Sequence, residues 1–452
     1  MPKKKTALTI EERLQQALVP AEEQPYEVPE NWVWVRLGAI AEIVTGGTPS
    51  KKHPEYYGGN FPFYKPSDLD QGRLTYDASE YLSEEGKKVS RIIPKNSTAV
   101  CCIGSIGKCG YLMCEGTTNQ QINSAIPKIN SLCMYYYLCT ENFVQNLLSM
   151  ASATTIAIVN KSKMESCAFP LPPLSEQQRI VERIEELFAK LDEAKERLQE
   201  VADSFAVRKA AILHKAFTGE LTKQWRCENG VSDESWEEKT IGEICSSLKY
   251  GTSKKSSDDG EVVVLRMGNL QNGEIDWSNL AYTSDEEDIK KYLLKSGDVL
   301  FNRTNSPELV GKTSIYRGEM PAIYAGYLIK LDYEKNIVVG DYLNYYLNSS
   351  KAKEYYMQVK TDGVSQSNIN AKKIGEFEIP LPTLSEQHEI VRLIDDLLAR
   401  ERKAQQAAEQ ALASIDLMKK SILACAFRGE LGTNKASEAS ALELLRQVLA
   451  EN

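Results

Sequence analysis

At residues 170–178 the sequence reads PLPPLSEQQ, and at residues 380–388 it reads PLPTLSEQH. The same offset of 210 places AFTGEL at residues 216–221 on AFRGEL at residues 426–431, without a gap. A fixed offset over so long a span indicates an internal duplication, which has to be identified before a fold is assigned. The Ser-Glu-Gln motif therefore marks the same point in each of two copies.

A looser match precedes the motif in each copy. WVWVRLG at residues 32–38 corresponds to WEEKTIG at residues 236–242. The repetition predicts two halves, each a variable globular segment followed by a fixed tail. The predicted parts are an N-terminal helical segment (1–31), a first globular domain (32–170), a first helical tail (171–230), a second globular domain (231–379), a second helical tail (380–432) and a C-terminal helix (433–452).

Each fixed tail has the signals of one long helix. Two prolines of the first motif end the preceding segment, and Ser175 is the expected N-cap, with Gln178 completing a capping box. Glu176 falls in the first turn, where the helix dipole favours negative charge. Gly219 and Gly429 stand where a left-handed residue can end a helix. We expect each helix to cover about 40 residues, or about 60 Å.

Apolar residues recur along both tails in alternating steps of four and three, which is the pattern of a coiled-coil seam. So narrow a seam needs a partner helix, and the other tail is the obvious one; the alternative is that each helix packs on its own globular domain. Glu401 interrupts the second seam once. Antiparallel pairing would relate the two globular domains by a pseudo-twofold axis. The predicted helix-pairing residues are Ile180, Ile184, Leu187, Leu191, Leu198, Val201, Ile390, Ile394, Leu397, Ala404, Ala408, Ala411 and Ile415, with Ala194, Phe205, Met418 and Ile422 in the same register.

The composition of the 452 residues, with an apolar fraction of 42%, is ordinary for a soluble protein of two or three domains. No run approaches the ~20 apolar residues of a membrane span, and the basic start lacks the apolar core of a secretory signal. Ten scattered cysteines without a C-x-x-C pair, and only three histidines, argue against a metal site and favour reduced thiols in the cytoplasm. The net charge of −9 argues against a general nucleic-acid coat protein, but it allows a DNA reader with localised basic residues.

No catalytic constellation stands out. GKT at residues 311–313 hints at a phosphate loop, but Ser306 occupies the place of the required glycine. GSIGK at residues 104–108 lacks the hydroxyl residue after lysine, and the Asp-Ile-Lys at residues 288–290 lacks a convincing partner carboxylate. The alternative that stays open is a fused DNA methyltransferase or nuclease with an unrecognised active site.

Short apolar runs at residues 92–93, 97–103, 262–265 and 298–301 predict strands, and residues 135–148 and 341–356 predict helices, so each globular domain is expected to be α+β. Polar loops lie between these elements at matching points of both halves. Asn and Gln can pair with adenine edges, Arg and Lys with guanine edges, and Lys, Ser and Thr with phosphates. The candidate DNA-binding residues are Thr48, Ser50, Lys51, Lys52, Lys65, Ser67, Lys108, Thr118, Asn119, Gln120, Gln121, Tyr250, Thr252, Lys254, Lys255, Arg266, Asn269, Asn302, Arg303, Thr304, Asn305, Lys312, Ser365, Gln366 and Asn368.

A tandem of variable domain and helix, punctuated by PLPPLSEQ and PLPTLSEQ, resembles the specificity subunit of type I restriction–modification systems. Further support comes from the asparagines Asn160 and Asn370, just before each motif, and from the Phe-x-Gly-Glu-Leu after each long helix. The resemblance covers the whole chain. It implies two mixed α/β target-recognition domains separated by two long helices, paired as an antiparallel coiled coil. One departure is His388 in place of Gln178.

The resemblance also implies partners. Each domain would read one half of a bipartite site in double-stranded DNA, and the helices would set the unread gap and dock modification subunits. Those subunits would carry adenine methyltransferase activity and bind S-adenosylmethionine, while restriction subunits would use ATP and Mg²⁺. This chain itself would be non-catalytic, without a cofactor or metal, and would not touch a membrane.

Short helices are predicted at both ends of the sequence. Thr9 and Glu12 form a capping box ahead of apolar residues, and leucines recur at helical spacing after residue 441. Our hypothesis from the sequence is that both segments pack near the long helices or on a modification subunit.

Overall fold

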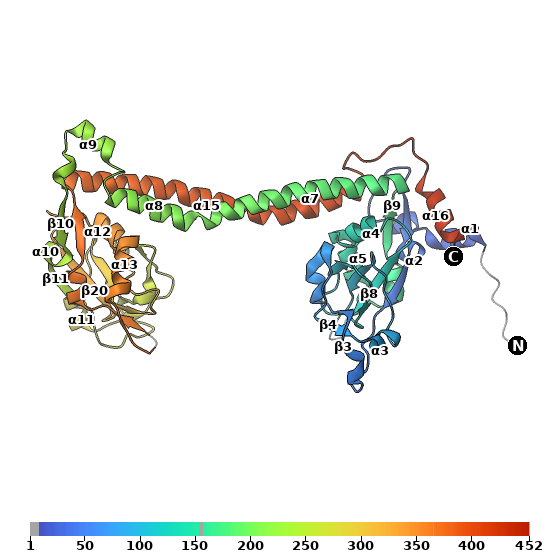
Figure 1. The fold of residues 1–452 in the computed structure, drawn as a ribbon, viewed down its shortest axis with the longest axis horizontal. Helices are drawn as coiled ribbons and strands as arrows, with labels where there is room; N and C mark the ends of the chain where they lie inside the picture. The colour runs from blue at the N-terminus through green and yellow to red at the C-terminus, as the bar shows by residue number, and fades with distance from the viewer. Residues whose placement is uncertain (1–8, 153–156, 365, 452) are drawn as a thin grey trace. The chain divides into compact units, whose positions relative to one another are not determined.

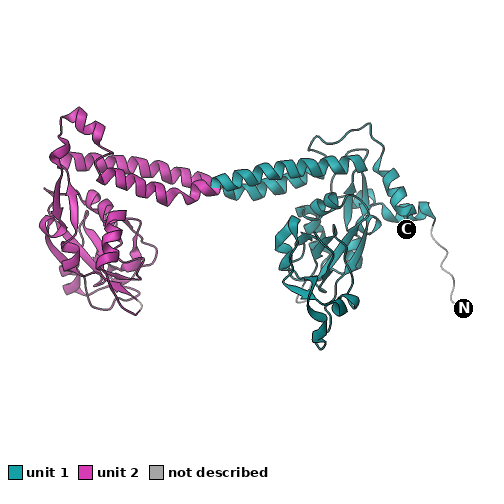
Figure 2. Ribbon diagram, viewed as in Figure 1, with its two compact units in different colours: residues 1–198, 410–452 teal, residues 199–409 magenta. Residues whose placement is uncertain are grey.

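The computed structural model describes residues 9–152, 157–364 and 366–451 (Figure 1). The chain forms two compact units, residues 1–198 with 410–452 and residues 199–409 (Figure 2). Each unit contains one globular domain together with parts of both long helices.

The first domain is built on two small sheets with helices packed against them. A four-stranded antiparallel sheet has the order β2 (Ala41–Thr45), β8 (Ile122–Pro127), β5 (Thr98–Cys101) and β6 (Cys109–Tyr111), and a three-stranded sheet has the order β4 (Glu80–Leu82), β3 (Tyr57–Tyr64) and β7 (Thr117–Thr118). Helices α4 (Ser131–Leu138) and α5 (Glu141–Met150) contribute buried residues to the same core as the four-stranded sheet.

The second domain repeats this plan. Its four-stranded sheet has the order β11 (Cys245–Tyr250), β20 (Leu328–Tyr333), β16 (Val299–Asn302) and β18 (Thr313–Ile315), and its three-stranded sheet has the order β15 (Tyr282–Thr283), β12 (Val262–Leu265) and β19 (Ala322–Tyr324). The helices α12 (Gly340–Leu347) and α13 (Ser350–Val359) follow. The shared strand order is what the duplication predicts.

Smaller elements complete the domains. In the first unit they are α2 (Leu37–Ile40), α3 (Glu84–Lys88) and α6 (Lys161–Glu165). In the second unit they are α9 (Lys223–Asn229), α10 (Ile241–Ile244), α11 (Glu286–Tyr292), α14 (Ala371–Gly375), β13 (Leu270–Gln271), β14 (Glu274–Ile275), β17 (Thr304–Asn305), β21 (Thr361–Asp362) and β22 (Ser367–Asn368).

The helices predicted inside the domains are each split in two. Thr140 caps α5, and its side chain accepts from the Phe143 amide, so the predicted helix over residues 135–148 breaks there. Ser349 caps α13 in the same way within the predicted span 341–356. Apolar periodicity continues across both breaks, but a hydroxyl side chain that binds the backbone starts a new helix. Ile93, expected in a strand, forms only an isolated bridge with Gly116.

The Ser-Glu-Gln motif connects a strand to a helix in each half. Strand β9 (Ala168–Leu171) pairs with β1 (Val33–Arg36), and β23 (Glu378–Leu381) pairs with β10 (Glu237–Thr240), so the last strand of each domain lies against its first. The long helices start directly afterwards. Ser175 lies inside its helix, so the predicted N-cap and the capping box with Gln178 are wrong. Gln178 instead contacts Asn130 and Glu182.

The second tail is one helix, α15 (Leu384–Ala426), as predicted, but the first is two, α7 (Leu174–Asp203) and α8 (Phe205–Phe217). At the break the Arg208 guanidinium donates to the Val201 carbonyl and to the Ser204 hydroxyl. The Arg208 side chain thus hydrogen-bonds to a carbonyl oxygen that would otherwise accept from a backbone amide of the next helical turn. Gly219 and Gly429 both have φ of +76°, so the left-handed residues expected after the helices are confirmed.

Three residues of the predicted seam are exposed. Ala404 is exposed, and Val201 and Met418 are 40% and 49% exposed. Leu398, rather than Leu397, is buried, because the first turns of α15 pack on their own domain with a spacing of four, which shifts the later register by one residue. The alternative of packing on the domain therefore holds for these first turns.

Beyond those turns the two tails contact each other within each unit. In the first unit Lys419 Nζ lies 2.5 Å from the Asp192 carboxylate and over the Phe188 ring. In the second unit Arg208 Nε lies 2.6 Å from the Glu401 carboxylate, so the residue that interrupts the seam is charge-paired. Each unit thus contains a stretch of helix-on-helix contact.

The terminal helices pack on the first domain. The capping box at Thr9 is confirmed at the start of α1 (Ile10–Ala17), and α16 (Ala441–Ala450) contacts that helix. Both contribute to the core that contains Trp34. The same core contains Ile180 and Ile184 of α7, so the hypothesis that the terminal segments pack near the long helices agrees with the structure. Among the described residues no helix is long and apolar enough to cross a membrane, and no group of His, Cys, Asp or Glu is arranged to hold a metal.

Candidate nucleic-acid interface

The polar loops of the first domain meet at one edge of its four-stranded sheet. The register pairs Thr45 with Asn123, Cys101 with Ile122, and Val100 with Cys109. These pairs fix the end of β2, the start of β8, the end of β5 and the start of β6 at the same edge. The loops at residues 46–53, 102–108 and 119–121 therefore emerge side by side.

The second domain has the same edge. Its register pairs Tyr250 with Ile329, Asn302 with Leu328, and Phe301 with Thr313, so the loops at residues 251–256, 303–312 and 325–327 emerge together. Strand β17 also pairs with β22, which brings the hairpin after α13 to this edge. We call these two surfaces the loop edges.

The three-stranded sheets add one loop to each edge. Strand β3 runs parallel to β7, and β12 runs parallel to β19. In the first domain β3 and β7 therefore end side by side, which places Lys65 near Asn119. In the second domain β12 and β19 end side by side, which places Arg266 near Ala325.

The described candidate residues differ in exposure. The exposed ones are Thr48, Ser50, Lys51, Lys52, Ser67, Gln120, Tyr250, Lys254, Lys255 and Gln366. The half-buried ones are Lys65, Lys108, Gln121, Arg266, Arg303, Thr304, Asn305, Lys312 and Asn368. The buried ones are Thr118, Asn119, Thr252, Asn269 and Asn302, and Ser365 lies outside the described residues.

Three of the buried candidates are held by hydrogen bonds within their own domain. Asn119 exchanges two hydrogen bonds of 3.0 Å with Gln121. Asn269 accepts from the Arg266 amide at 2.9 Å, and Thr252 donates to Asp288. These side chains hold the loop backbones in place, so they would influence ligand binding through the conformation of the loops and not by direct contact.

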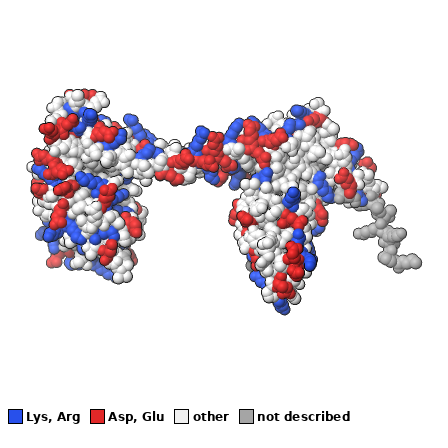
Figure 3. Space-filling model, in the orientation of Figure 1, with Lys and Arg blue, Asp and Glu red and all other residues white. Residues whose placement is uncertain are grey.

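Several lysines of the loop edges are paired with carboxylates. Lys65 lies 2.8 Å from Glu80, Lys108 lies 2.6 Å from Asp70, and Lys254 lies 2.7 Å from Asp285. The hydrogen bond that Lys254 donates to Asp285 raises the pKa of Lys254. Exposed pairs of this kind are weak, so a phosphate can compete for the lysine. Figure 3 shows acidic and basic side chains interspersed over the domains on the face drawn.

Arg303 is a cation of the loop edges whose side chain is held in place, and its Nη1 donates to the Gly326 carbonyl at 3.4 Å. Its guanidinium stacks on the Tyr250 ring at 4.8 Å from the centroid, and its Nε has no hydrogen-bond partner among the described residues. A stacked guanidinium presents its remaining donors in a fixed plane, which suits a guanine edge or a phosphate.

A hollow of about 510 Å³ opens beside this position. It is lined by Arg266, Asn269, Asp276, Asn279 and Tyr327. Tyr327 is 47% exposed and was missed, as was Asn279, because neither has a counterpart in a polar loop of the first half. Only the sheet register, which brings residues 325–327 to this edge, identifies Tyr327.

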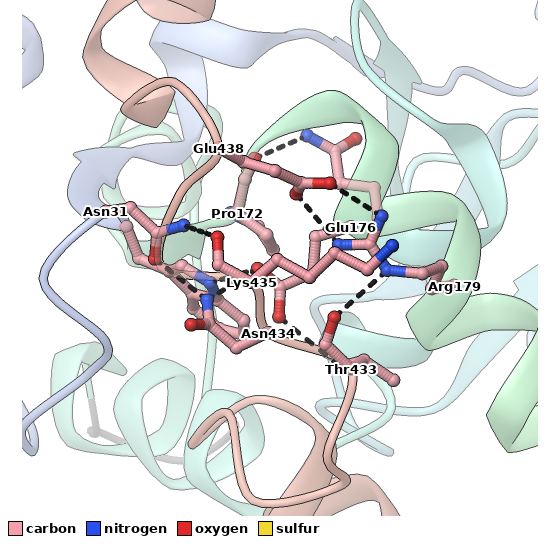
Figure 4. A network of polar contacts seen from close by, with 10 residues as sticks. Asn31, Pro172, Glu176, Arg179, Thr433, Asn434, Lys435 and Glu438 are labelled. Atoms are coloured by element: carbon pink, nitrogen blue, oxygen red, sulfur yellow. Dashed lines mark hydrogen bonds and ion pairs between the residues drawn. The ribbon is translucent and has the colours of Figure 1, made fainter.

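The glutamate of the first motif is the centre of a buried polar network (Figure 4). Glu176 is fully buried and accepts hydrogen bonds from Trp32 Nε1 at 2.7 Å, Asn434 Nδ2 at 2.8 Å and Thr433 Oγ1 at 3.3 Å. Arg179 binds both oxygens of Glu438 at 2.8 and 2.9 Å, which lowers the pKa of Glu438. The start of α7 thus holds the segment that follows α15.

The second motif does the same with different donors. Glu386 is fully buried and accepts from Thr222 Oγ1 and from Arg226 Nη1, both at 2.7 Å. The start of α15 thus holds the segment that follows α8. The only sequence signal for these two networks was that the motifs are nearly identical. The sequence predicts only a helix-dipole role for Glu176 and does not predict its hydrogen bonds.

The glutamine of each motif closes the turn. Gln177 donates to the Pro172 carbonyl at 2.9 Å and accepts from the Asn130 amide at 3.0 Å. Gln387 repeats this arrangement with Pro382 at 2.9 Å and Val339 at 2.8 Å. The motif therefore fixes how each long helix leaves its domain.

Comparison with known proteins fits this geometry. The family model described as the type I restriction modification DNA specificity domain matches residues 29–203 and 233–410, once for each half. The chain belongs to this family. As a member of the specificity family it is 28% identical over 462 residues to the EcoBI specificity subunit of Escherichia coli, covering 94% of this chain and 93% of that protein. It is 25% identical to the EcoKI specificity subunit of Escherichia coli K12, covering 94% and 96%.

Two solved structures have a similar fold. The HsdS subunit from Thermoanaerobacter tengcongensis matches with a TM-score of 0.63 and 20% identity, over 90% of this chain and 99% of that one. A chain from a study of complex assembly and conformational transition in the type I R-M system matches with a TM-score of 0.66 and 19% identity, over 90% and 100%.

Proposed function

We propose that this chain supplies the DNA specificity of a type I restriction–modification complex, each domain reading one half of a bipartite double-stranded site. The observation that carries the proposal is the pair of loop edges, formed at the same place on two domains with the same strand order. Two similar readers on one chain suit a target of two separate half-sites. Membership in the specificity family supports the same reading.

We further propose that the two tails pair along their length as an antiparallel coiled coil that sets the unread gap. The contacts within the units support it. Asp192 meets Lys419, whereas Arg208, further along the first tail, meets Glu401, which comes earlier in the second. Residues further along the first tail thus contact residues earlier in the second tail, as they would in an antiparallel pair.

Catalysis is proposed to belong to partner subunits. Modification subunits would bring S-adenosylmethionine and methylate adenine, and restriction subunits would bring ATP and Mg²⁺. The names of the relatives as specificity subunits support a non-catalytic role. Mapping methylated adenines across a host genome tests the whole proposal, with a split motif and a constant gap as the expected result. Methylation by the purified chain alone would instead support the fused-enzyme alternative.

Inserting one heptad into both tails, after Leu198 and before Gln410, is expected to widen the unread gap by about three base pairs. Seven helical residues add about 10.5 Å, and each base pair spans about 3.4 Å. A whole heptad keeps the seam in register. The two half-sites themselves should stay the same in the methylation map. Replacing one heptad by another of equal length is the control. An unchanged gap after the insertion would refute the proposal that the length of the paired tails sets the gap.

Replacing Arg303 by alanine is expected to relax specificity in one half-site only. A lost base contact costs about 1–3 kcal/mol, which appears as tolerated substitutions at one position of that half. Arg317 is the matched control, because it lies at the opposite edge of the same sheet and is paired with Glu274 at 2.8 Å. Equal effects of the two substitutions on the methylation map would argue against a reading role for Arg303.

A further inference from the structure

A basic cavity lies between α8 and the second domain, entirely within the second unit. Its volume is about 300 Å³, and Lys209 of α8, Lys312 at the end of the 303–312 loop and Lys353 of α13 all line it. Glu308 is the only carboxylate residue in the lining. Three elements thus direct positive charge to one hollow.

The charges of this cavity are not neutralised within the described part of the chain. Lys312 Nζ donates to the neutral Gln271 side chain at 3.0 Å. Neither Lys209 nor Lys353 has an ion pair with a described carboxylate. Burial, together with the neighbouring charges of Lys353 and Arg402, lowers the pKa of Lys209. Clustered like charges are unfavourable unless an anion joins them.

The equivalent place in the first unit is neutralised. Lys419, which corresponds to Lys209 at the offset of 210, is paired with Asp192. Lys108, which precedes β6 as Lys312 precedes β18, is paired with Asp70. Val144 of α5 stands where α13 has Lys353. The duplication therefore supplies its own comparison, and the unpaired cluster belongs to the second unit alone.

We propose that Lys209, Lys312 and Lys353 hold one phosphate of the DNA backbone beside the second half-site, so that the spacer helix itself touches DNA. This inference rests on the proposed function. The loop that begins with Arg303 ends at Lys312, so a duplex read by the start of that loop brings its sugar-phosphate backbone to the cavity at the other end. Lysine contacts of this kind position the duplex and carry no sequence information.

The test uses the full chain and a fluorescein-labelled, mixed-sequence duplex of about 40 base pairs, with anisotropy read between about 50 and 200 mM KCl. The double variant K209Q/K353Q is expected to reduce the slope of log K against log salt by about 0.9, the value for one phosphate contact. Binding should weaken about tenfold at low salt, by the same factor for unrelated duplexes. The variant K419Q is the matched control and should bind as the original chain does.

The outcomes separate this inference from the proposed function. If K209R/K353R has the slope of the original chain, positive charge at these positions is what matters, and the proposed phosphate contact is supported. If the original chain binds no duplex, the proposed function fails. If the original chain binds the duplex but K209Q/K353Q keeps the original slope, only the proposed phosphate contact is overturned. Loss of modification-subunit capture with unchanged DNA binding would also overturn it, in favour of an acidic protein surface.

Discussion

Replacing Glu386 by alanine is expected to lower the free energy of unfolding of the second unit by about 3–5 kcal/mol, because it removes one partner of a buried ion pair. Glu386 is fully buried and Arg226 is 7% exposed. The guanidinium would keep Asp233 at 2.8 Å but would lose its buried acceptor, and the Thr222 hydroxyl would lose its acceptor as well. An uncompensated charge inside the protein costs more than the pair contributes.

Urea unfolding followed by tryptophan fluorescence measures this effect on the full chain. Glu386→Gln is expected to cost less than alanine, because an amide oxygen still accepts from Thr222 and Arg226. Glu389→Ala on the same helix is the control, since its pair with the exposed Arg392 lies near the surface and contributes little to stability. A cost for Glu386→Ala no larger than that of Glu389→Ala would contradict the role of the buried network.

Replacing Phe427 by alanine is expected to destabilise the first unit by about 3–5 kcal/mol, the range for emptying a buried phenylalanine site. Phe427 follows α15 directly, is 1% exposed and contacts the Tyr137 ring at 5.2 Å between centroids. It shares one core with Ile180 and Ile184 of α7. Its loss would therefore loosen the end of one helix and the start of the other together.

The duplication again supplies the control. Phe217 is the equivalent residue after the first tail, but it is only half-buried, although it meets Tyr342 and Tyr346 at 5.3 and 5.0 Å. Phe217→Ala should therefore cost clearly less than Phe427→Ala in the same urea experiment. Equal costs for the two substitutions would show that burial does not decide the effect.

The long helices could be predicted from the sequence because a repeat of four and three leaves a narrow apolar stripe. The break at Ser204 could not, because it depends on where the Arg208 side chain turns. The shift to Leu398 could not either, since it arises from packing on the domain, which a seam pattern ignores. Periodicity reports which faces are apolar and says little about which neighbour covers them.

The candidate reading residues show the same limit. Composition and repetition predicted polar loops, and strand register brings several of these segments to shared edges. Whether a given amide faces outward was beyond the pattern: Asn119 is buried and its neighbour Gln120 is exposed. Tyr327 was overlooked because a lone aromatic in a short loop carries no signal until its strand partners are known.

The division of the chain into units has a consequence for biosynthesis. The second unit, residues 199–409, is contiguous, so a nascent polypeptide can complete it while the remainder is still on the ribosome. The first unit needs residues 410–451 to cover Ile180 and Ile184, although most of it is made first. A product truncated by premature termination would carry a finished second reader and an open, apolar first one, which is the kind of surface that chaperones and proteases select.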